Sequence, residues 1–338
     1  MTEPLRGALP APRSLRRLSV WAGIALTVVF AALAVRGVHL RDVGNTIRAS
    51  DIWWLVPALA LTAAGTLMRA QRWRVLFTPA SRPPLGAVTE ATLIGYLFNI
   101  ILPARLGEVA RIVALHRRAG TSRAEATSTV VVERVFDVLS LLVLLFIAQP
   151  VLPRVASLRI AGALAAVLSA GLIAAVMSLA VWGERPVRWA LGPLRLTPGL
   201  SPQRAEQIAS GIIGGLGALR AWRQAALALG WTFASWIVLA LSAWCVLEEF
   251  NLDLSPVAGL LLVIATGLSA VIPSAPAGLG VFEAAGVVAL RAYDVPQTDA
   301  LSCALVFHAL NVLPFIAAGL VAVHLQARLR DPGPNRGS

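Results

Sequence analysis

The chain has 338 residues, of which 57% are hydrophobic and only 14% are charged. A soluble protein usually carries roughly a quarter charged residues, so this composition excludes an ordinary soluble domain. The net charge is +12, and every basic residue is an arginine. These arginines lie in the loops between apolar runs, as membrane topology requires, so they do not indicate nucleic acid as a partner.

The predicted elements are apolar helices, and a helix needs about 20 residues to cross a membrane. In chain order the full spans cover about Leu18–Val35, Ile52–Met68, Ala126–Ala148, Ile160–Trp182, Ala225–Leu247 and Ala300–His324. Two further apolar segments, Leu85–Leu115 and Val257–Leu290, are interrupted by proline and glycine. The sequence therefore predicts an all-α polytopic membrane protein with about six full spans and two broken, re-entrant helical hairpins.

The N-terminus resembles a signal peptide, because Arg13, Arg16 and Arg17 precede an apolar run that ends in small residues. Many spans follow, so we favour an uncleaved signal anchor behind a cytoplasmic tail of residues 1–17. A cleaved signal is the alternative. The uncleaved anchor and the cleaved signal both place the loop after the first span outside the cytoplasm.

The hairpins follow from the distribution of arginine. If the segment Leu85–Pro103 crossed the membrane, the arginines between Arg105 and Arg123 would lie outside, against the positive-inside rule. A re-entrant segment that turns near Pro103 and Gly107 returns them to the cytoplasm. The alternative is eight full crossings. The distribution of arginine predicts a multi-pass protein of the inner (cytoplasmic) cell membrane with both termini in the cytoplasm. Three arginines of the first outer loop, Arg36, Arg41 and Arg48, are an exception to the positive-inside rule.

This topology defines one transmembrane domain, residues 18–324, followed by a cytoplasmic tail at residues 325–338. Its repeat halves are about 18–148 and 160–324. Within the long cytoplasmic loop, Ser201 and Pro202 begin a predicted amphipathic segment, about residues 201–222. That segment is expected on the membrane surface or against the bundle.

One motif occurs in both hairpins. Pro103-Ala104-Arg105-Leu106-Gly107-Glu108 and Pro276-Ala277-Gly278-Leu279-Gly280-Val281-Phe282-Glu283 share a proline, an alanine, a Leu-Gly pair and a glutamate. A helix break in lipid leaves backbone groups without partners and persists only inside protein or beside a wet cavity. Inverted repeats with matching breaks are typical of transporters, although proline and glycine kinks are common in membrane helices. The break residues are Pro103, Gly107, Pro276, Gly278 and Gly280.

Ionisable residues at membrane depth are costly and are usually functional or paired. Glu133 and Asp137 lie four residues apart, on one helix face, with Arg134 beside them. One interpretation is an ion-pair network in which Arg134 bonds Glu108 or Glu283. The other is a headgroup site, with arginine on a phosphate and the carboxylates on a cationic group. The two are compatible.

Arg105 and Arg111 flank Glu108 at the first break, where free N–H groups and arginine favour phosphate. Ordinary snorkelling to the interface is the alternative. The arginines at 69, 72 and 74 are mainly a topology signal that could also recruit anionic headgroups. His308 is either part of the cavity or a packing residue. The candidate lipid-binding residues are Asn99, Arg105, Glu108, Arg111, Glu133, Arg134, Asp137, Glu283 and His308.

At these motifs the chain resembles the transmembrane flippase domain of lysylphosphatidylglycerol synthases. The resemblance is carried by Arg69-Ala-Gln-Arg-Trp-Arg74, Asn99-Ile-Ile-Leu-Pro-Ala-Arg-Leu-Gly-Glu-Val-Ala-Arg111, Val132-Glu-Arg-Val-Phe-Asp137 and Pro276-Ala-Gly-Leu-Gly-Val-Phe-Glu283. It implies a lipid-translocation domain. In the synthases this domain moves aminoacylated phosphatidylglycerol, and stand-alone relatives are linked to other lipids, including polyprenyl-linked glycans and hopanoids. The soluble aminoacyl-transfer domain is missing here, so the chain is not expected to make the lipid.

The sequence therefore predicts a flippase-like transporter that moves an anionic or lipid-linked headgroup between leaflets. The chain has no GxxxxGK[ST] loop, so transport is expected to be passive or ion-coupled, with Glu133, Asp137 and Glu283 as candidate proton carriers. We expect no enzyme activity, no cofactor and no metal, since Cys245 and Cys303 stand alone in apolar runs. The alternatives are a membrane lipid or glycan transferase, and a non-transporting partner of a lipid-modifying enzyme. The expected partner is a membrane lipid.

Overall fold

The computed structural model describes residues 28–36, 38–102, 106–182, 222–270 and 276–328. Within these ranges the chain is helical and forms no strand, which confirms the predicted all-α polytopic membrane fold. Among the described residues, four helices are long and apolar enough to cross a membrane, at Ile52–Val75, Ala156–Ala174, Trp222–Glu249 and Gln297–Arg328. Most of the first predicted span, the break residue Pro103, the candidate lipid-binding residue Arg105, and the amphipathic segment up to residue 221 lie outside the described ranges.

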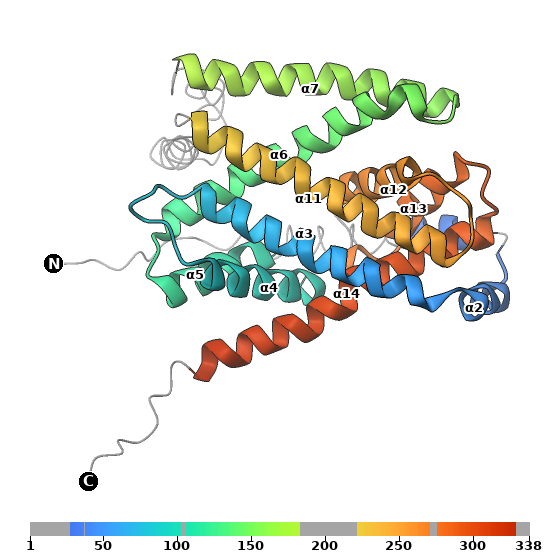
Figure 1. The fold of residues 1–338 in the computed structure, drawn as a ribbon, viewed down its shortest axis with the longest axis horizontal. Coiled ribbons are helices and arrows are strands. Elements are labelled where there is room, and N and C mark those ends of the chain that lie inside the picture. The colour runs from blue at the N-terminus through green and yellow to red at the C-terminus, as the bar shows by residue number, and fades with distance from the viewer. Residues whose placement is uncertain (1–27, 37, 103–105, 183–221, 271–275, 329–338) are drawn as a thin grey trace, which may run out of the picture.

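The first described elements start at one end of the bundle, and the last of them runs back along its length (Figure 1). Residues 28–35 are helical, and they are followed by α2 (Leu40–Ala49), η1 (Ile52–Trp54) and α3 (Leu55–Val75). The short helix α2 lies in the loop predicted to be outside and was not predicted. Two bonds tie its end to the last residue of α11, since Asp51 N donates to Glu249 O at 2.8 Å and Ser50 Oγ donates to Glu249 Oε1 at 2.8 Å.

The first broken segment folds into a hairpin of α4 (Leu85–Ile101) and α5 (Gly107–Ala119). Pro84 precedes α4 in an extended conformation, and Gly120 ends α5 at φ 67°, a left-handed conformation that suits glycine. At 1.5 Å per residue, the two helices are only about 25 Å and about 20 Å long. Arg118 near the end of α5 bonds Glu90 near the start of α4 at 3.1 Å. The chain therefore enters and leaves this hairpin at the same end of the bundle, as the arginine count predicted.

The next two helices form the far side of the molecule. Ser122 caps α6 (Arg123–Ala148) by accepting from Glu125 N at 3.4 Å, and η2 (Gln149–Val151) leads into α7 (Ala156–Trp182). In Figure 1, α6 crosses the bundle obliquely and α7 returns above it. Three ionisable residues lie within the apolar stretch of α6, which keeps it out of the set of four apolar helices.

The second half consists of α11 (Trp222–Glu249), α12 (Pro256–Ser269), η4 (Pro276–Gly278), α13 (Val281–Arg291) and α14 (Gln297–Arg328). The helices α12 and α13 pack together as the second hairpin. Figure 1 shows this hairpin at the opposite end of the bundle from α4 and α5. The break is compact, because Ala277, Gly278 and Gly280 have φ of 61°, 77° and 78°.

The bundle is held by close helix contacts at small residues, as is common in membranes. The helices α3 and α11 run side by side. Their contact contains a bond between Thr62 Oγ1 and Ser242 Oγ at 2.8 Å. The break element η4 contacts α4, and α14 packs against both α4 and α13. The two hairpins therefore meet inside the bundle, and one long helix lies against both.

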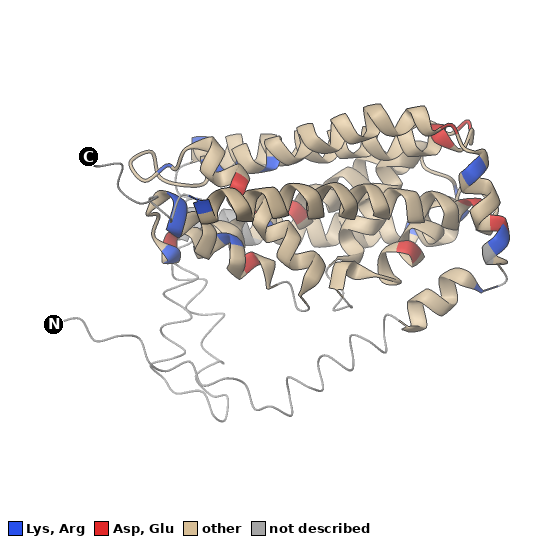
Figure 2. Ribbon diagram, turned by 90° about the horizontal axis from the view of Figure 1, so that it is seen from below, with Lys and Arg blue, Asp and Glu red and all other residues tan. Residues whose placement is uncertain are grey.

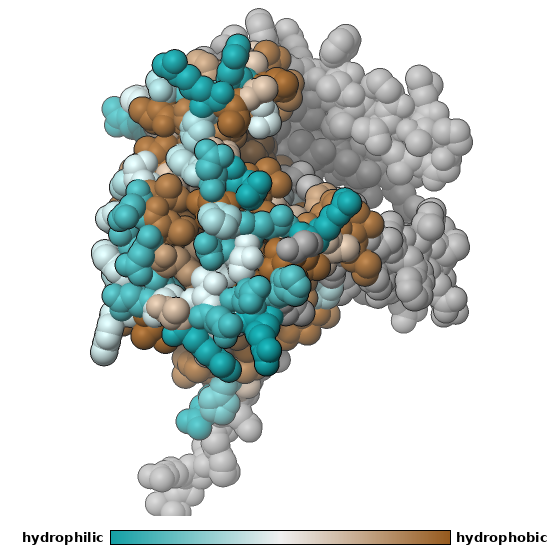
Figure 3. Space-filling model, turned by 90° about the vertical axis from the view of Figure 1, so that its right-hand side faces the viewer, coloured by the Kyte–Doolittle hydropathy of each residue, from teal (hydrophilic) through white to brown (hydrophobic). Residues whose placement is uncertain are grey.

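Charged residues gather at the two ends of this bundle, with a few between them (Figure 2). Figure 3 looks onto the end that carries α2 and shows hydrophilic side chains spread over it among hydrophobic ones. The few charges between the ends are therefore the ones that need an explanation.

Candidate functional site

A cluster of buried charges joins three helices in the half of the bundle that contains the first hairpin. The helix α3 supplies one arginine, α5 supplies a glutamate and an arginine, and α6 supplies two carboxylates and an arginine. The members are Arg72, Glu108, Arg111, Glu133, Arg134 and Asp137. We call this set the charge cluster.

The inner part of the charge cluster is closed to solvent. The side chain of Arg72 is 1% exposed; its Nη2 lies 2.7 Å from Glu133 Oε1, and its Nη1 pairs with Asp137 Oδ1. Arg111 is also buried, and its Nη1 lies 3.2 Å from the same Glu133 oxygen. Two buried arginines thus hold one buried carboxylate. Such an arrangement is required because an unpaired charge inside a protein or a bilayer is strongly unfavourable.

The outer part of the charge cluster is open. The side chain of Arg134 is 41% exposed, and its Nη2 lies 3.3 Å from Glu108 Oε1 and 3.0 Å from Glu133 Oε1. Its Nη1 lies 3.5 Å from Asp137 Oδ2. Glu108 in turn lies 2.6 Å from Arg111. The three arginines balance the three carboxylates, and the pair of Arg134 and Glu108 forms the edge that a ligand can reach.

The first break delivers α5 to this cluster through a close backbone contact. A Cβ atom at Gly107 would lie 2.0 Å from Gly95 O and 2.4 Å from Asn99 Oδ1, so no larger residue fits there. The contact sets the first turn of α5, which carries Glu108 and Arg111, against α4. Asn99 thus lies at the closest approach of the two helices, and its Oδ1 is buried with no hydrogen-bond partner among the described atoms.

Two tryptophans lie under the arginines. The guanidinium of Arg111 lies 4.6 Å from the ring centre of Trp73, and that of Arg69 lies 4.3 Å from Trp236. Within the described ranges Arg69 forms no ion pair, and its Nε is buried without a partner. It does interact electrostatically with Asp137. Arg69 therefore adds one uncompensated positive charge next to the balanced cluster.

Sequence reasoning missed Arg72, which it assigned with its neighbours to membrane topology. A signal was present, because Arg69 and Arg72 are three residues apart and so share one face of α3. Arg74 lies elsewhere and donates to Pro83 O at 3.0 Å, in the loop before α4. Of the three arginines, only the two on one face reach the bundle interior.

The other two candidate residues form a separate pair. Glu283 on α13 and His308 on α14 are both buried, with Glu283 Oε1 2.6 Å from His308 Nδ1. Phe282 stacks on the imidazole at 4.5 Å between ring centres. No ion pair links this pair to the charge cluster within the described part of the chain. The structure thus divides the predicted site residues into two groups, while Arg105 and Pro103 fall outside the described ranges.

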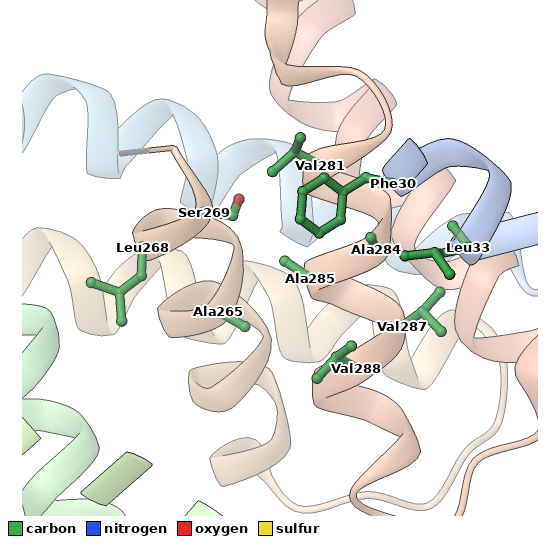
Figure 4. A pocket seen from close by; sticks show the side chains of 11 residues that line it. Phe30, Leu33, Ala265, Leu268, Ser269, Val281, Ala284, Ala285, Val287 and Val288 are labelled. Atoms are coloured by element: carbon green, nitrogen blue, oxygen red, sulfur yellow. The ribbon is translucent and has the colours of Figure 1, made fainter. Parts of the chain in front are cut away.

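The second hairpin also borders an apolar groove of about 410 Å³. Figure 4 shows side chains from residues 28–35, α12 and α13 around it, including Phe30, Leu268 and Val288. Among the described residues that line it, only Ser269 has a polar side chain, and its Oγ already donates to Thr266 O at 2.7 Å. The groove suits hydrocarbon and offers nothing to a charged headgroup. Among the described residues, no cluster of histidine, cysteine or carboxylate side chains is arranged to hold a metal.

Comparisons with known proteins give a matching family model and two similar proteins. Residues 20–319 match the family model described as the lysylphosphatidylglycerol synthase TM region. The chain is 25% identical to the glycosyltransferase AglD of Haloferax volcanii over 345 residues, which cover 91% of this chain and 54% of AglD. It thus spans only about half the length of that relative. It is also 23% identical to a UPF0104 membrane protein of Methanocaldococcus jannaschii over 241 residues, 69% of this chain and 97% of that protein.

Proposed function

Because the chain belongs to the lysylphosphatidylglycerol synthase transmembrane family, we propose that it moves a lipid with an anionic headgroup between the two leaflets of the membrane. The observation that carries this proposal is the charge cluster. Three arginines and three carboxylates lie inside an apolar bundle, with one arginine exposed at the edge. Arg69, which forms no ion pair within the described part of the chain, lies beside them. Charges at this depth are retained mainly where a polar ligand or an ion must pass.

In this proposal the headgroup phosphate binds at the edge of the cluster. Arg134 is accessible there, and its planar guanidinium can hold two phosphate oxygens. The phosphate takes the place of Glu108 on Arg134, while Glu108 keeps its bond to Arg111. Arg69 supplies the positive charge that a phosphate monoanion needs, because the remaining pairs are already balanced. The buried pairs of Arg72 hold α3 and α6 in place during this exchange.

The hairpins explain how a headgroup passes the membrane in this proposal. They enter the bundle from opposite ends and touch where η4 meets α4, so neither hairpin spans the full thickness of the bilayer. Irregular backbone at such breaks is tolerated only inside protein or beside a water-filled cavity. Inverted pairs of broken helices are a common basis for alternating access in transporters. The acyl chains remain in the bilayer while the headgroup crosses between the hairpins.

The test is a translocation assay with the purified protein in liposomes. Fluorescent phosphatidylglycerol is compared with a zwitterionic lipid, and a membrane-impermeant quencher reports the outer-leaflet fraction. R134Q removes a charge-assisted contact worth about 1.5–3 kcal/mol, so the rate is expected to fall roughly tenfold to a hundredfold. R69Q is also expected to lower the translocation rate of the anionic lipid.

The matched control is R123Q, an exposed arginine at the start of the same helix as Arg134. It should translocate lipid at the wild-type rate. The proposal fails if no anionic lipid moves faster than in empty vesicles, or if R134Q and R123Q cannot be distinguished.

A second candidate function is transfer of a group to a lipid-linked acceptor, which the likeness to AglD favours. A carboxylate paired with arginine is a weak general base, because the ion pair stabilises its ionised form, and arginines hold all three carboxylates of the charge cluster. Translocation is therefore the first choice. Glycosylated lipid formed by the purified chain from an activated sugar, with no translocation, would favour the second candidate.

A further inference from the structure

The pair of Glu283 and His308 lies outside the charge cluster, and the imidazole has an unusual set of neighbours. Its Nδ1 lies 2.6 Å from Glu283 Oε1, and its Nε2 lies 3.1 Å from Ala277 O. Both neighbours are oxygen atoms. The second carboxyl oxygen, Glu283 Oε2, accepts from Gly280 N at 2.7 Å. One histidine on α14 therefore bridges to α13 and to the backbone of the second break.

To be hydrogen bonds at the same time, the two imidazole contacts need one proton more than a neutral histidine and an ionised carboxylate carry. A backbone carbonyl only accepts, so Nε2 must carry a hydrogen to bond Ala277 O. A neutral imidazole has one N–H, which leaves Nδ1 with a lone pair facing a carboxylate oxygen. A contact of 2.6 Å between two lone pairs is repulsive. Both contacts are therefore hydrogen bonds at the same time only when a second proton lies between Nδ1 and Glu283 Oε1, on one atom or the other, and in both cases the pair is neutral overall.

No other charge within the described ranges is bonded to this pair. The helix α12 and the break element η4 contain no ionisable side chain. On the remaining elements that pack against α13 or α14, the ionisable side chains make other contacts or lie toward the helix ends. They are Arg41, Asp42, Arg48, Arg69, Arg72, Arg74, Glu90, Tyr96, Arg223, the buried thiol Cys245, Glu248, Glu249, Arg291, Asp299, the buried thiol Cys303, His324 and Arg328. Loss of the proton thus leaves a net negative charge that none of these side chains pairs with.

We propose that Glu283 and His308 form a proton-binding site that couples proton movement to the position of the second hairpin. With the proton bound, His308 holds both Glu283 and Ala277 O, so α14 is locked to the break. Without it, the imidazole faces the carboxylate lone pair to lone pair, and a buried negative charge is unfavourable. His308 then releases one of its two partners, and the break is freed from α14.

The release can reach the first hairpin, because α14 also packs along α4. Tyr96 on α4 packs against Phe315 on α14 at 5.0 Å, one of the contacts between them. The proton is taken up at one membrane face and given up at the other, and no other covalent bond is made or broken. This inference rests on the proposed lipid transport, since it names the ion that would drive it.

The first experiment reads the proton directly and needs no transport. Nitrogen NMR of labelled histidine, with isotope-edited infrared spectra of the carboxyl groups, is recorded on the full chain in lipid as pH is varied. H308Q assigns the resonance among the four histidines. The expected result is one extra proton, seen either as an imidazolium at His308 or as a protonated carboxyl at Glu283. This signal is expected to be absent in E283Q and to disappear from the wild type at alkaline pH. A singly protonated His308 beside an ionised Glu283 at every pH overturns the proposal.

The second experiment measures lipid translocation with and without a pH gradient across the liposome. The wild-type rate is expected to rise with a gradient of one polarity, and E283Q and H308Q are expected to lose that response. H324Q is the matched control, because His324 is exposed on the same helix, and it should respond as the wild type does. Translocation that ignores the gradient overturns the coupling alone, whereas no translocation under any condition overturns the transport proposal. Melting temperatures of E283Q and H308Q separate unfolding from uncoupling.

Discussion

Arg72 is the most deeply buried arginine of the charge cluster, and it bridges Glu133 to Asp137. A buried ion pair adds little net stability compared with a well-packed apolar pair. Removing one partner, however, leaves the other charge buried and unpaired. The inner arginine is therefore a structural member of the site, and the exposed Arg134 is the member available to a ligand.

The substitution R72M is expected to lower the free energy of unfolding by about 3–5 kcal/mol, because it strands buried carboxylates. The measurement is the thermal unfolding midpoint of the purified protein in detergent. R74M is the matched control on the same helix, since it removes only a part-buried bond to Pro83 O and should cost about 1 kcal/mol. Equal shifts for the two variants would contradict the structural role of Arg72.

Gly107 offers a second residue-scale prediction. G107A places a methyl group where Gly95 O and Asn99 Oδ1 already lie, so α4 and α5 must separate. The expected cost is about 1–3 kcal/mol, typical of overpacking, together with slower lipid translocation. The control G86A lies on α4 with nothing within 4 Å of the new methyl group, so it should be neutral or slightly stabilising. A G107A protein as stable as G86A would show that the close approach is not required.

At the residue scale, spacing within one helix was predictable and partners across helices were not. The shared face of Glu133 and Asp137 follows from their separation of four residues, and both do contact Arg72. The arginine itself comes from another helix, and no sequence pattern says which helices are neighbours. Glu283 and His308 illustrate the same limit, since they belong to different helices and meet only when α13 packs on α14.

At the scale of elements, the hairpins were predictable because charge constrains topology along the whole chain. A cluster of arginines after one apolar segment was enough to indicate that the segment returns to its side of entry. The helix α2 was missed, because its ten residues contain glycine and asparagine, and its mixed polarity resembles a loop. Its position depends on bonds to Glu249 at the end of α11, far away in the sequence.

Cysteine labelling tests both hairpins at once. In a C245A/C303A background, single cysteines replace Ala80 and Arg117 around the first hairpin, and Asp253 and Asp294 around the second. All four positions are exposed. The expected result with a membrane-impermeant thiol reagent is that each pair reacts from one side, with the two pairs on opposite sides. The four sites serve as controls for one another, and a pair split between the two sides would show that its segment crosses the membrane.

At the scale of the whole molecule, α14 is the element that touches both hairpins, since it packs on α4 and on α13. The charge cluster lies beside the first hairpin and the histidine pair beside the second. Any coupling between them must therefore pass through this helix or through the contact of η4 with α4. The sequence predicted that two related halves exist, but the contact of η4 with α4 depends on how the helices assemble.

The orientation of the whole bundle is the last prediction. The arginine count places both termini in the cytoplasm and the loop after α11 outside. A green fluorescent protein fused to the C-terminus is expected to fluoresce. Alkaline phosphatase fused after Asp253 is expected to be active, and the same enzyme fused at the C-terminus to be inactive. The reverse pattern would invert the bundle and would require the proposed direction of proton entry to be reassigned.

The charges within α6 also have a consequence for how the chain enters the membrane during synthesis. A charged residue at the centre of an inserting helix costs about 2.5–3.5 kcal/mol, and α6 carries three in its apolar stretch. Their partners outside α6 are Arg72, Glu108 and Arg111, and all of them precede α6 in the chain. The helix can thus leave the insertion machinery against arginines and a glutamate that are already in place. A chain that began at α6 would have no such partners. The order of the helices along the chain therefore allows the charged residues of α6 to be paired as this helix enters the membrane.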